Sequence, residues 1–202
     1  MPLAQEKTFY KGKDPKDIPR YSAGEAAQIL RMPAATLRSW FHGNTYPSKR
    51  GPASSMALLE FADPERARLS FANIIEAYVL RTLRRGRHLS MPKVRESMDY
   101  ARDHLGCDRI LLRTDDLRSM PGRLFIQHYG SLIDLSESGQ LGLMTILESY
   151  LTRIEAESGF ARRFYPMTRP EELQSPKQIL VDPTVSFGSP VTARKAIRTA
   201  AI

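Results

Sequence analysis

The stretch from residue 21 to residue 41, which reads YSAGEAAQILRMPAATLRSWF, limits what this chain can fold into more than any other part. Ser22 and Glu25 have the Ser-x-x-Glu spacing of a capping box, in which each side chain accepts a hydrogen bond from the other residue's backbone N–H. Pro33 ends the first helix because the residue before a proline avoids the helical region. We therefore predict two short helices, over residues 23–30 and 34–41, joined by a tight turn.

The second of these helices has one face suited to DNA. Leu37 and Phe41 are four residues apart and should pack on the first helix, and the second helix of a helix-turn-helix lies in the major groove. A small side chain would let the backbone approach DNA, hydroxyls could donate to phosphates, and an arginine could contact a phosphate or a guanine edge. An ordinary helical hairpin with a solvated arginine is the alternative. The residues turned outward are Ala35, Thr36, Arg38, Ser39 and His42.

A hairpin is predicted next, because turn residues separate two short runs, 44–46 and 56–61. Its tip would be Lys49-Arg50-Gly51-Pro52, and a basic tip could reach flanking DNA as a wing; a flexible charged loop is the alternative. The net charge is +8, and residues 1–56 hold nine Lys and Arg against four Asp and Glu. Such an excess would attract phosphate.

A second basic run lies between Arg81 and Arg95, where six cations occur with no acid. It could form another patch that contacts the DNA backbone. We favour the simpler interpretation, in which it is the solvated side of a helix.

The rest of the chain is predicted as a mixture of helices and strands. Hydrophobic periodicity favours helices over residues 71–85, 91–105 and 141–156, and the last residues, 193–202, also look helical. Strand candidates lie at 109–113, 123–129 and 131–135, with strand and turn pieces in GFARRFYP and KQILVDPTVSFGSPVT. The expected fold class is mixed α/β (α+β) and helix-rich, with an N-terminal helix-turn-helix followed by an α+β domain.

The sequence offers no recognisable catalytic constellation. Its four histidines are scattered, and it contains no His-Glu-x-x-His, phosphate-binding glycine loop or nucleophile elbow. Asp115 and Asp116 are expected on a solvated turn. The single cysteine, Cys107, excludes a disulfide framework and argues against a cysteine-based zinc site. We expect no enzyme, no cofactor and no metal. The polar N-terminus and the lack of a long apolar run predict a cytoplasmic protein without a membrane segment.

Several segments resemble known families. YSAGEAAQILRMPAATLRSWF is similar to the start of a MerR-type winged helix-turn-helix, with its Tyr-x-x-x-Glu-Ala-Ala opening and Thr-Leu-Arg-x-Trp recognition helix. LSFANIIEAYVLRTLRRGRHLSMPKVRESMDYARDHLG and GFARRFYP resemble VapB-type antitoxins, and ILVDPTVSFGSPVT resembles the opening of their C-terminal DUF433 domain. The MerR resemblance implies DNA contacts by Thr36, Arg38 and Trp40 and by a wing at Lys49 and Arg50.

The antitoxin resemblance implies a function. Such a protein would bind operator DNA, neutralise a PIN-domain ribonuclease toxin and repress the operon that encodes both. We expect a homodimer, because one short recognition helix reads only a few base pairs. The alternatives are a stand-alone MerR-like transcriptional regulator without a toxin partner, and a middle domain that acts as an enzyme or a structural adaptor.

Composition, hydrophobic pattern and these similarities together suggest four parts in the chain. Residues 1–20 would be a flexible basic arm and residues 21–66 a winged helix-turn-helix DNA-binding domain. Residues 67–165 would be an α+β middle domain for dimerisation or partner binding. Because the DUF433 resemblance stops after Val191, residues 166–202 are expected to be a partial DUF433-like segment.

Overall fold

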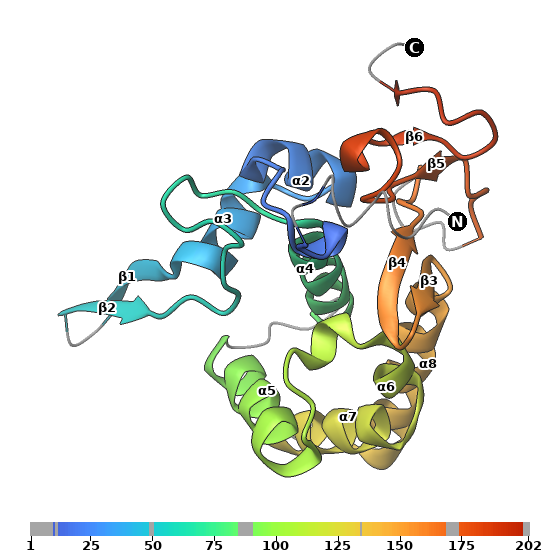
Figure 1. The fold of residues 1–202 in the computed structure, drawn as a ribbon. Coiled ribbons are helices and arrows are strands. Elements are labelled where there is room, and N and C mark those ends of the chain that lie inside the picture. The colour runs from blue at the N-terminus through green and yellow to red at the C-terminus, as the bar shows by residue number, and fades with distance from the viewer. Residues whose placement is uncertain are drawn as a thin grey trace.

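The computed structural model describes residue 10 and residues 12–48, 51–84, 91–133, 135–168 and 174–199. Figure 1 shows a helix-rich chain with small antiparallel sheets, which confirms the predicted fold class. None of its described helices is long and apolar enough to cross a membrane. The elements in chain order are η1 (Pro15–Asp17), α2 (Ala23–Leu30), α3 (Ala34–His42), β1 (Asn44–Ser48), β2 (Gly51–Ser55), α4 (Phe71–Leu83), α5 (Met91–Leu105), η2 (Ile110–Leu112), α6 (Thr114–Arg118), α7 (Met120–Leu132), α8 (Glu137–Leu151), β3 (Ile154–Glu157), β4 (Phe160–Phe164), β5 (Ile179–Leu180), η3 (Ser186–Gly188) and β6 (Val191–Thr192).

Helix α4 is the centre of the molecule. Every one of its residues except Arg81 is buried, including the polar Asn73, Glu76 and Thr82. It contacts α2, α8, η1, η2 and β4, and Figure 1 shows it between the N-terminal helices and the rest of the chain. The Ser70 hydroxyl caps α4 by accepting a hydrogen bond from the Asn73 N–H at 3.2 Å. The N-terminal helices therefore rest on a rigid support.

The predicted helix-turn-helix is confirmed. The Ser22–Glu25 capping box is present in both directions, with the Glu25 carboxylate 2.8 Å from the Ser22 N–H. Arg31 ends α2 in the left-handed conformation, at φ 49°, and Pro33 is the N-cap of α3. Only residues 31–33 separate the two helices, so the turn is as short as predicted from the position of Pro33.

The predicted hairpin is also present, but its second arm was placed too late in the chain. β1 pairs with β2 in antiparallel register, with Ser48 opposite Gly51, so the connecting loop holds only two residues. The run from Met56 is not a strand, because the backbone N–H groups of Leu58 and Leu59 donate to the Trp40 carbonyl at 2.8 and 2.9 Å. These contacts carry the chain from the hairpin back to α3.

The three strands predicted between residues 109 and 135 were wrong. Residues 110–112 form η2, and residues 120–132 form α7. Within α7 the buried side chains are Phe125, Ile126 and Tyr129, whereas Leu124 is exposed. This spacing belongs to one face of a helix, and packing against α5 and α8 overrode the strand preference of aromatic and branched residues.

Two predictions toward the C-terminus also need correction. The helix expected over 141–156 is α8, which ends at Leu151, and Ile154 pairs with Phe164 in the β3–β4 hairpin. The break follows from Arg153, whose buried guanidinium donates to the carbonyls of Tyr165 and Pro166 at 2.9 and 3.0 Å; burial lowers its pKa. The strand predicted in GFARRFYP is confirmed as β4.

The helix expected over 193–202 does not form in its described part, 193–199. The chain there turns back, and Val191 forms a β-bridge with Arg198. Ala196 has φ 52°, in the left-handed region, which interrupts any right-handed helix. The division of the chain into four domains stays a prediction. Of the arm predicted over 1–20, residues 1–9 and 11 lie outside the described residues, and the remainder includes η1, which contacts α4.

Candidate nucleic-acid interface

The inner face of helix α3 is buried in the core. Leu37, Trp40 and Phe41 are 0%, 2% and 4% exposed. The Phe41 ring lies 4.9 Å, centroid to centroid, from Phe61 on the segment after the hairpin. The inward positions of Leu37 and Phe41 are therefore as predicted, and they fix which side of α3 faces outward.

The outer face of α3 brings together the polar residues that the sequence placed there. Ala35, Arg38 and His42 are exposed, and Thr36 and Ser39 are half-buried. The Ser39 hydroxyl donates to the Thr36 carbonyl at 2.7 Å. Arg38 has no hydrogen-bond or ion-pair partner within the part of the chain that the structure describes. A solvated guanidinium beside hydroxyls and a small side chain is a surface that can approach a phosphate or a base edge.

Trp40, which the MerR resemblance placed among the DNA contacts, lies in the core. Its ring packs under the guanidinium of Arg84, whose central carbon is 5.6 Å from the ring centroid. Its indole Nε1 is buried and has no hydrogen-bond partner among the described atoms. The contact surface considered below therefore uses the other predicted side chains of α3.

The described arginines of the basic run from Arg81 to Arg95 make contacts within the protein. The Arg81 guanidinium donates to the Leu30 carbonyl at the end of α2. Arg95 donates from Nη2 to the carbonyls of Met56 and Ala57 at 2.7 and 2.8 Å. Together with Arg84 above the Trp40 ring, these arginines connect α4 and α5 to the helix-turn-helix and to the end of the hairpin. We call Arg81, Arg84 and Arg95 the brace.

The sequence did not reveal the brace because its partners are backbone carbonyls and a ring distant in the chain. A basic run without acids gives no sign of such partners. Of the basic residues considered for DNA contacts, four lie outside the described residues: the wing candidates Lys49 and Arg50, and the brace neighbours Arg85 and Arg87. The predicted wing contacts therefore stay predictions.

The entry to α2 is also held tightly. The Glu25 carboxylate accepts hydrogen bonds from the Ser22 N–H and from the Ser22 hydroxyl. Both bonds lower the pKa of Glu25, the backbone bond more strongly, and keep this carboxylate charged at the positive end of the helix. The preceding Tyr21 is buried, and its hydroxyl donates to the Gly188 carbonyl at 2.7 Å. Burial raises the pKa of Tyr21, so the phenol is protonated at neutral pH.

Other candidate sites of chemistry do not assemble. Among the described residues, no group of three or more His, Cys, Asp and Glu could hold a metal ion. Asp115 and Asp116 lie in the first turn of α6 and not on the solvated turn that was expected. They pair with Arg118, at 3.6 Å, and with Arg113. The two carboxylates are therefore part of local helix stabilisation.

Comparison with known proteins agrees with this geometry. Residues 19–98 match the model of a family described as "Putative DNA-binding HTH domain". The chain is 29% identical over 199 residues to a Mycobacterium tuberculosis (strain ATCC 25618 / H37Rv) protein named "Putative antitoxin VapB45". The aligned region covers 91% of this chain and 81% of that protein. The matched family segment contains α2, α3, the hairpin, α4 and the start of α5. It therefore includes both the candidate interface and the brace.

A solved structure has a similar fold. The crystal structure of Rv2018 from Mycobacterium tuberculosis matches with a TM-score of 0.60 and 24% sequence identity, over 91% of this chain and 84% of that one. This likeness extends the shared fold well beyond the helix-turn-helix. The finer resemblances, to MerR-type regulators and to DUF433, stay predictions.

Proposed function

We propose that this protein is a non-enzymatic, sequence-specific DNA-binding antitoxin that represses its own operon and neutralises a PIN-domain ribonuclease toxin. The observation that carries the DNA-binding half is the solvated, unpaired Arg38 at the centre of the outer face of α3. The family match over residues 19–98 supports it. The antitoxin half is supported by the similarity to a protein whose name describes an antitoxin.

In this proposal α3 enters the major groove. Arg38 contacts a guanine edge or a phosphate, Thr36 donates to a phosphate, and Ala35 allows a close approach of the backbone. Ser39 donates to a phosphate by exchanging its hydrogen bond to the Thr36 carbonyl. His42 lies at the C-terminal end of the same face, with its ring centroid 4.8 Å from that of Phe61. The β1–β2 hairpin extends away from the helices in Figure 1, and we propose that Lys49 and Arg50 contact the flanking DNA from its tip.

A homodimer remains part of the proposal, because two recognition helices double the length of DNA that is read. Of the two apolar helices that could pair the chains of a homodimer, α4 and α8, the first is covered by the chain itself. The other, α8, exposes Leu141 and Ile146, at 70% and 43%. We therefore place the pairing surface on α8. Light scattering at micromolar concentration should give twice the mass of the chain, and a monomeric mass would contradict this part.

DNA binding is tested with a labelled fragment of the region upstream of the gene. The wild-type chain should shift this fragment in the presence of excess unrelated DNA, and Arg38→Ala should weaken that shift. Arg66→Ala is a matched control, since the Arg66 side chain is 80% exposed and lies outside α3. Equal binding of related and unrelated DNA by the wild-type chain would contradict sequence-specific recognition.

Neutralisation is tested separately. The product of the adjacent gene, when expressed alone, should arrest growth, and co-expression with this chain should restore growth and yield a complex that survives gel filtration. Failure of both results, with specific DNA binding intact, would favour the stand-alone regulator.

A further inference from the structure

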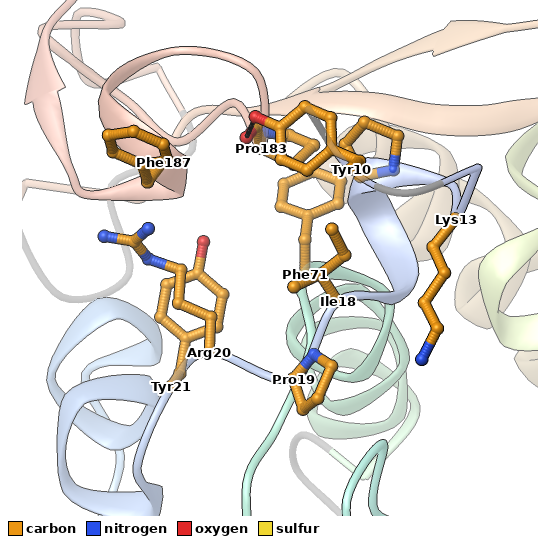
Figure 2. A pocket seen from close by; sticks show the side chains of 10 residues that line it. Tyr10, Lys13, Ile18, Pro19, Arg20, Tyr21, Phe71, Pro183 and Phe187 are labelled. Atoms are coloured by element: carbon orange, nitrogen blue, oxygen red, sulfur yellow. Dashed lines mark hydrogen bonds between the residues drawn. The ribbon is translucent and has the colours of Figure 1, made fainter. Parts of the chain in front are cut away.

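A cavity of about 490 Å³ lies where the N-terminal segment, the start of α4 and the C-terminal segment meet. Figure 2 shows Phe187 and Pro183 on one side of it and Ile18 and Phe71 on the other, with the Tyr21 hydroxyl pointing between them. Ligand pockets for small organic molecules typically have volumes of about 300–1,000 Å³ and apolar walls with few polar groups. The size and lining of this cavity fit that description.

Arg20 supplies a positive charge in the wall of this cavity. Its Nη2 donates to the Ser189 hydroxyl at 2.6 Å and to the Ser186 carbonyl at 3.5 Å. Within the described ranges, no carboxylate pairs with Arg20, no acidic side chain lines the cavity, and the Nε and Nη1 donors have no acceptor. A guanidinium presents donors in a planar fork that matches a carboxylate. The half-buried Arg20 can therefore bind an anion that the described part of the chain does not provide.

The loop that Arg20 contacts has an unusual backbone. Ser186, Phe187 and Gly188 all have positive φ, at 47°, 54° and 70°. This conformation is costly for a bulky residue, and such strain concentrates at ligand sites. It leaves the Phe187 ring 49% exposed at the edge of the cavity, on the same side as the Arg20 guanidinium.

Gly188 explains how this loop is held. A Cβ at Gly188 would lie 2.3 Å from the Tyr21 hydroxyl oxygen, so only glycine permits the hydrogen bond between that hydroxyl and the Gly188 carbonyl. The strained loop is thus fixed directly against Tyr21. This contact places the Phe187 ring and the Arg20 guanidinium together at one opening of the cavity.

We propose that this cavity binds a small aromatic carboxylate. The flat apolar body lies between Phe187 and Phe71, and the carboxylate accepts hydrogen bonds from the free donors of Arg20. Lys13, at the far edge of the cavity, adds a second positive charge. The ligand class follows from the combination of aromatic walls, an unpaired guanidinium and the absence of acids from the described lining.

The position of the cavity connects this ligand to the helix-turn-helix. Arg20 and Tyr21 directly precede Ser22, the N-cap of α2, and the Tyr21 backbone pairs with Leu69 just before α4. A bound ligand would therefore contact the start of the helix-turn-helix and the C-terminal loop at once. The site does not depend on the proposed DNA binding, and its test uses the free chain.

The test is a calorimetric titration of the full chain with 2-naphthoate and, in parallel, with the uncharged 2-naphthamide. We expect saturable binding of one naphthoate per chain, and affinity for the amide lower by about tenfold because the charge-assisted hydrogen bonds are lost. Arg20→Gln should weaken naphthoate binding by about tenfold for the same reason. Phe187→Asn, which removes the ring but tolerates positive φ, should weaken both ligands.

Two variants on the same segment serve as controls. Arg194→Gln removes an exposed arginine, and Ile197→Asn removes an apolar side chain that is 44% exposed, close to Phe187 in exposure. Both should leave naphthoate binding unchanged. Equal affinity for acid and amide, or equal losses in Arg194→Gln and Arg20→Gln, would overturn the assignment.

A measurement on the wild-type chain avoids any effect of the substitutions on folding. Nuclear Overhauser contacts from naphthoate protons to the Ile18 methyl groups would place the ligand in the cavity. Contacts confined to other methyl groups, or no saturable binding at all, would remove the site.

Discussion

The outer face of α3 and the brace carry the same charged group and use it in opposite ways. Arg38 is solvated and unpaired among the described residues, whereas Arg81 and Arg95 donate to backbone carbonyls of the helix-turn-helix and of the segment after the hairpin. Arg84 lies over the ring of the buried Trp40. The cations of α4 and α5 therefore position the surface that Arg38 presents.

This difference shows that an arginine forms contacts within the protein where unsatisfied backbone carbonyls lie within its reach, and stays solvated where they do not. The end of α2 leaves carbonyls that no residue of the helix can satisfy, and a guanidinium from α4 reaches one of them. The outer face of α3 has no such acceptors, so its arginine stays available to a ligand. Four predictions test this contrast between Arg38 and the brace.

The largest effect is expected for Trp40→Ala. Loss of a fully buried aromatic ring should lower the free energy of unfolding by about 3–5 kcal/mol. Urea denaturation monitored by circular dichroism measures this, with Arg38→Ala as the stability control from the same helix. A Trp40→Ala chain of wild-type stability would return Trp40 to the candidate interface.

Arg38→Ala should weaken operator binding by about 1–3 kcal/mol and leave stability unchanged. If Arg38 reads a guanine, the loss should be largest for the cognate base pair. If it contacts a phosphate, the loss should be uniform across sequences and the salt dependence shallower. Fluorescence anisotropy over a series of salt concentrations separates these cases, and unchanged affinity would exclude Arg38 from the interface.

Arg95→Ala should lower the free energy of unfolding by about 1 kcal/mol, because it removes two exposed hydrogen bonds to carbonyls. DNA affinity should fall only slightly and its salt dependence should be preserved, since Arg95 donates to backbone carbonyls of the protein and not to DNA phosphates. A slope shallower by about one unit would instead make Arg95 a phosphate contact.

The smallest effect concerns the capping box. The folded-state pKa of Glu25 is lowered, so its contribution to stability is fully present above the ordinary glutamate pKa and is lost as the pH falls through the lowered value. Glu25→Gln should therefore destabilise the chain at neutral pH, and the difference should shrink as the pH falls below the ordinary glutamate pKa. Urea midpoints at neutral and at acidic pH test this, and a constant difference would mean that the charge of Glu25 is unimportant.

Local signals were predicted well. The capping box, the stop at Pro33 and the four-residue spacing of Leu37 and Phe41 act within one or two turns of helix, so the sequence contains both partners. The same signals identified the exposed side chains of α3. The run around Phe125 and Ile126 was misread because a short apolar segment suits a buried strand or a helix equally well.

Caps and helical periodicity are local, so the sequence alone locates the helix-turn-helix and indicates which of its residues turn outward. The burial of Trp40, the contacts of the brace, and the meeting of Arg20 and Phe187 at one cavity follow from the folded structure. Each of those contacts joins residues brought together by packing around α4, and no local pattern encodes the partner.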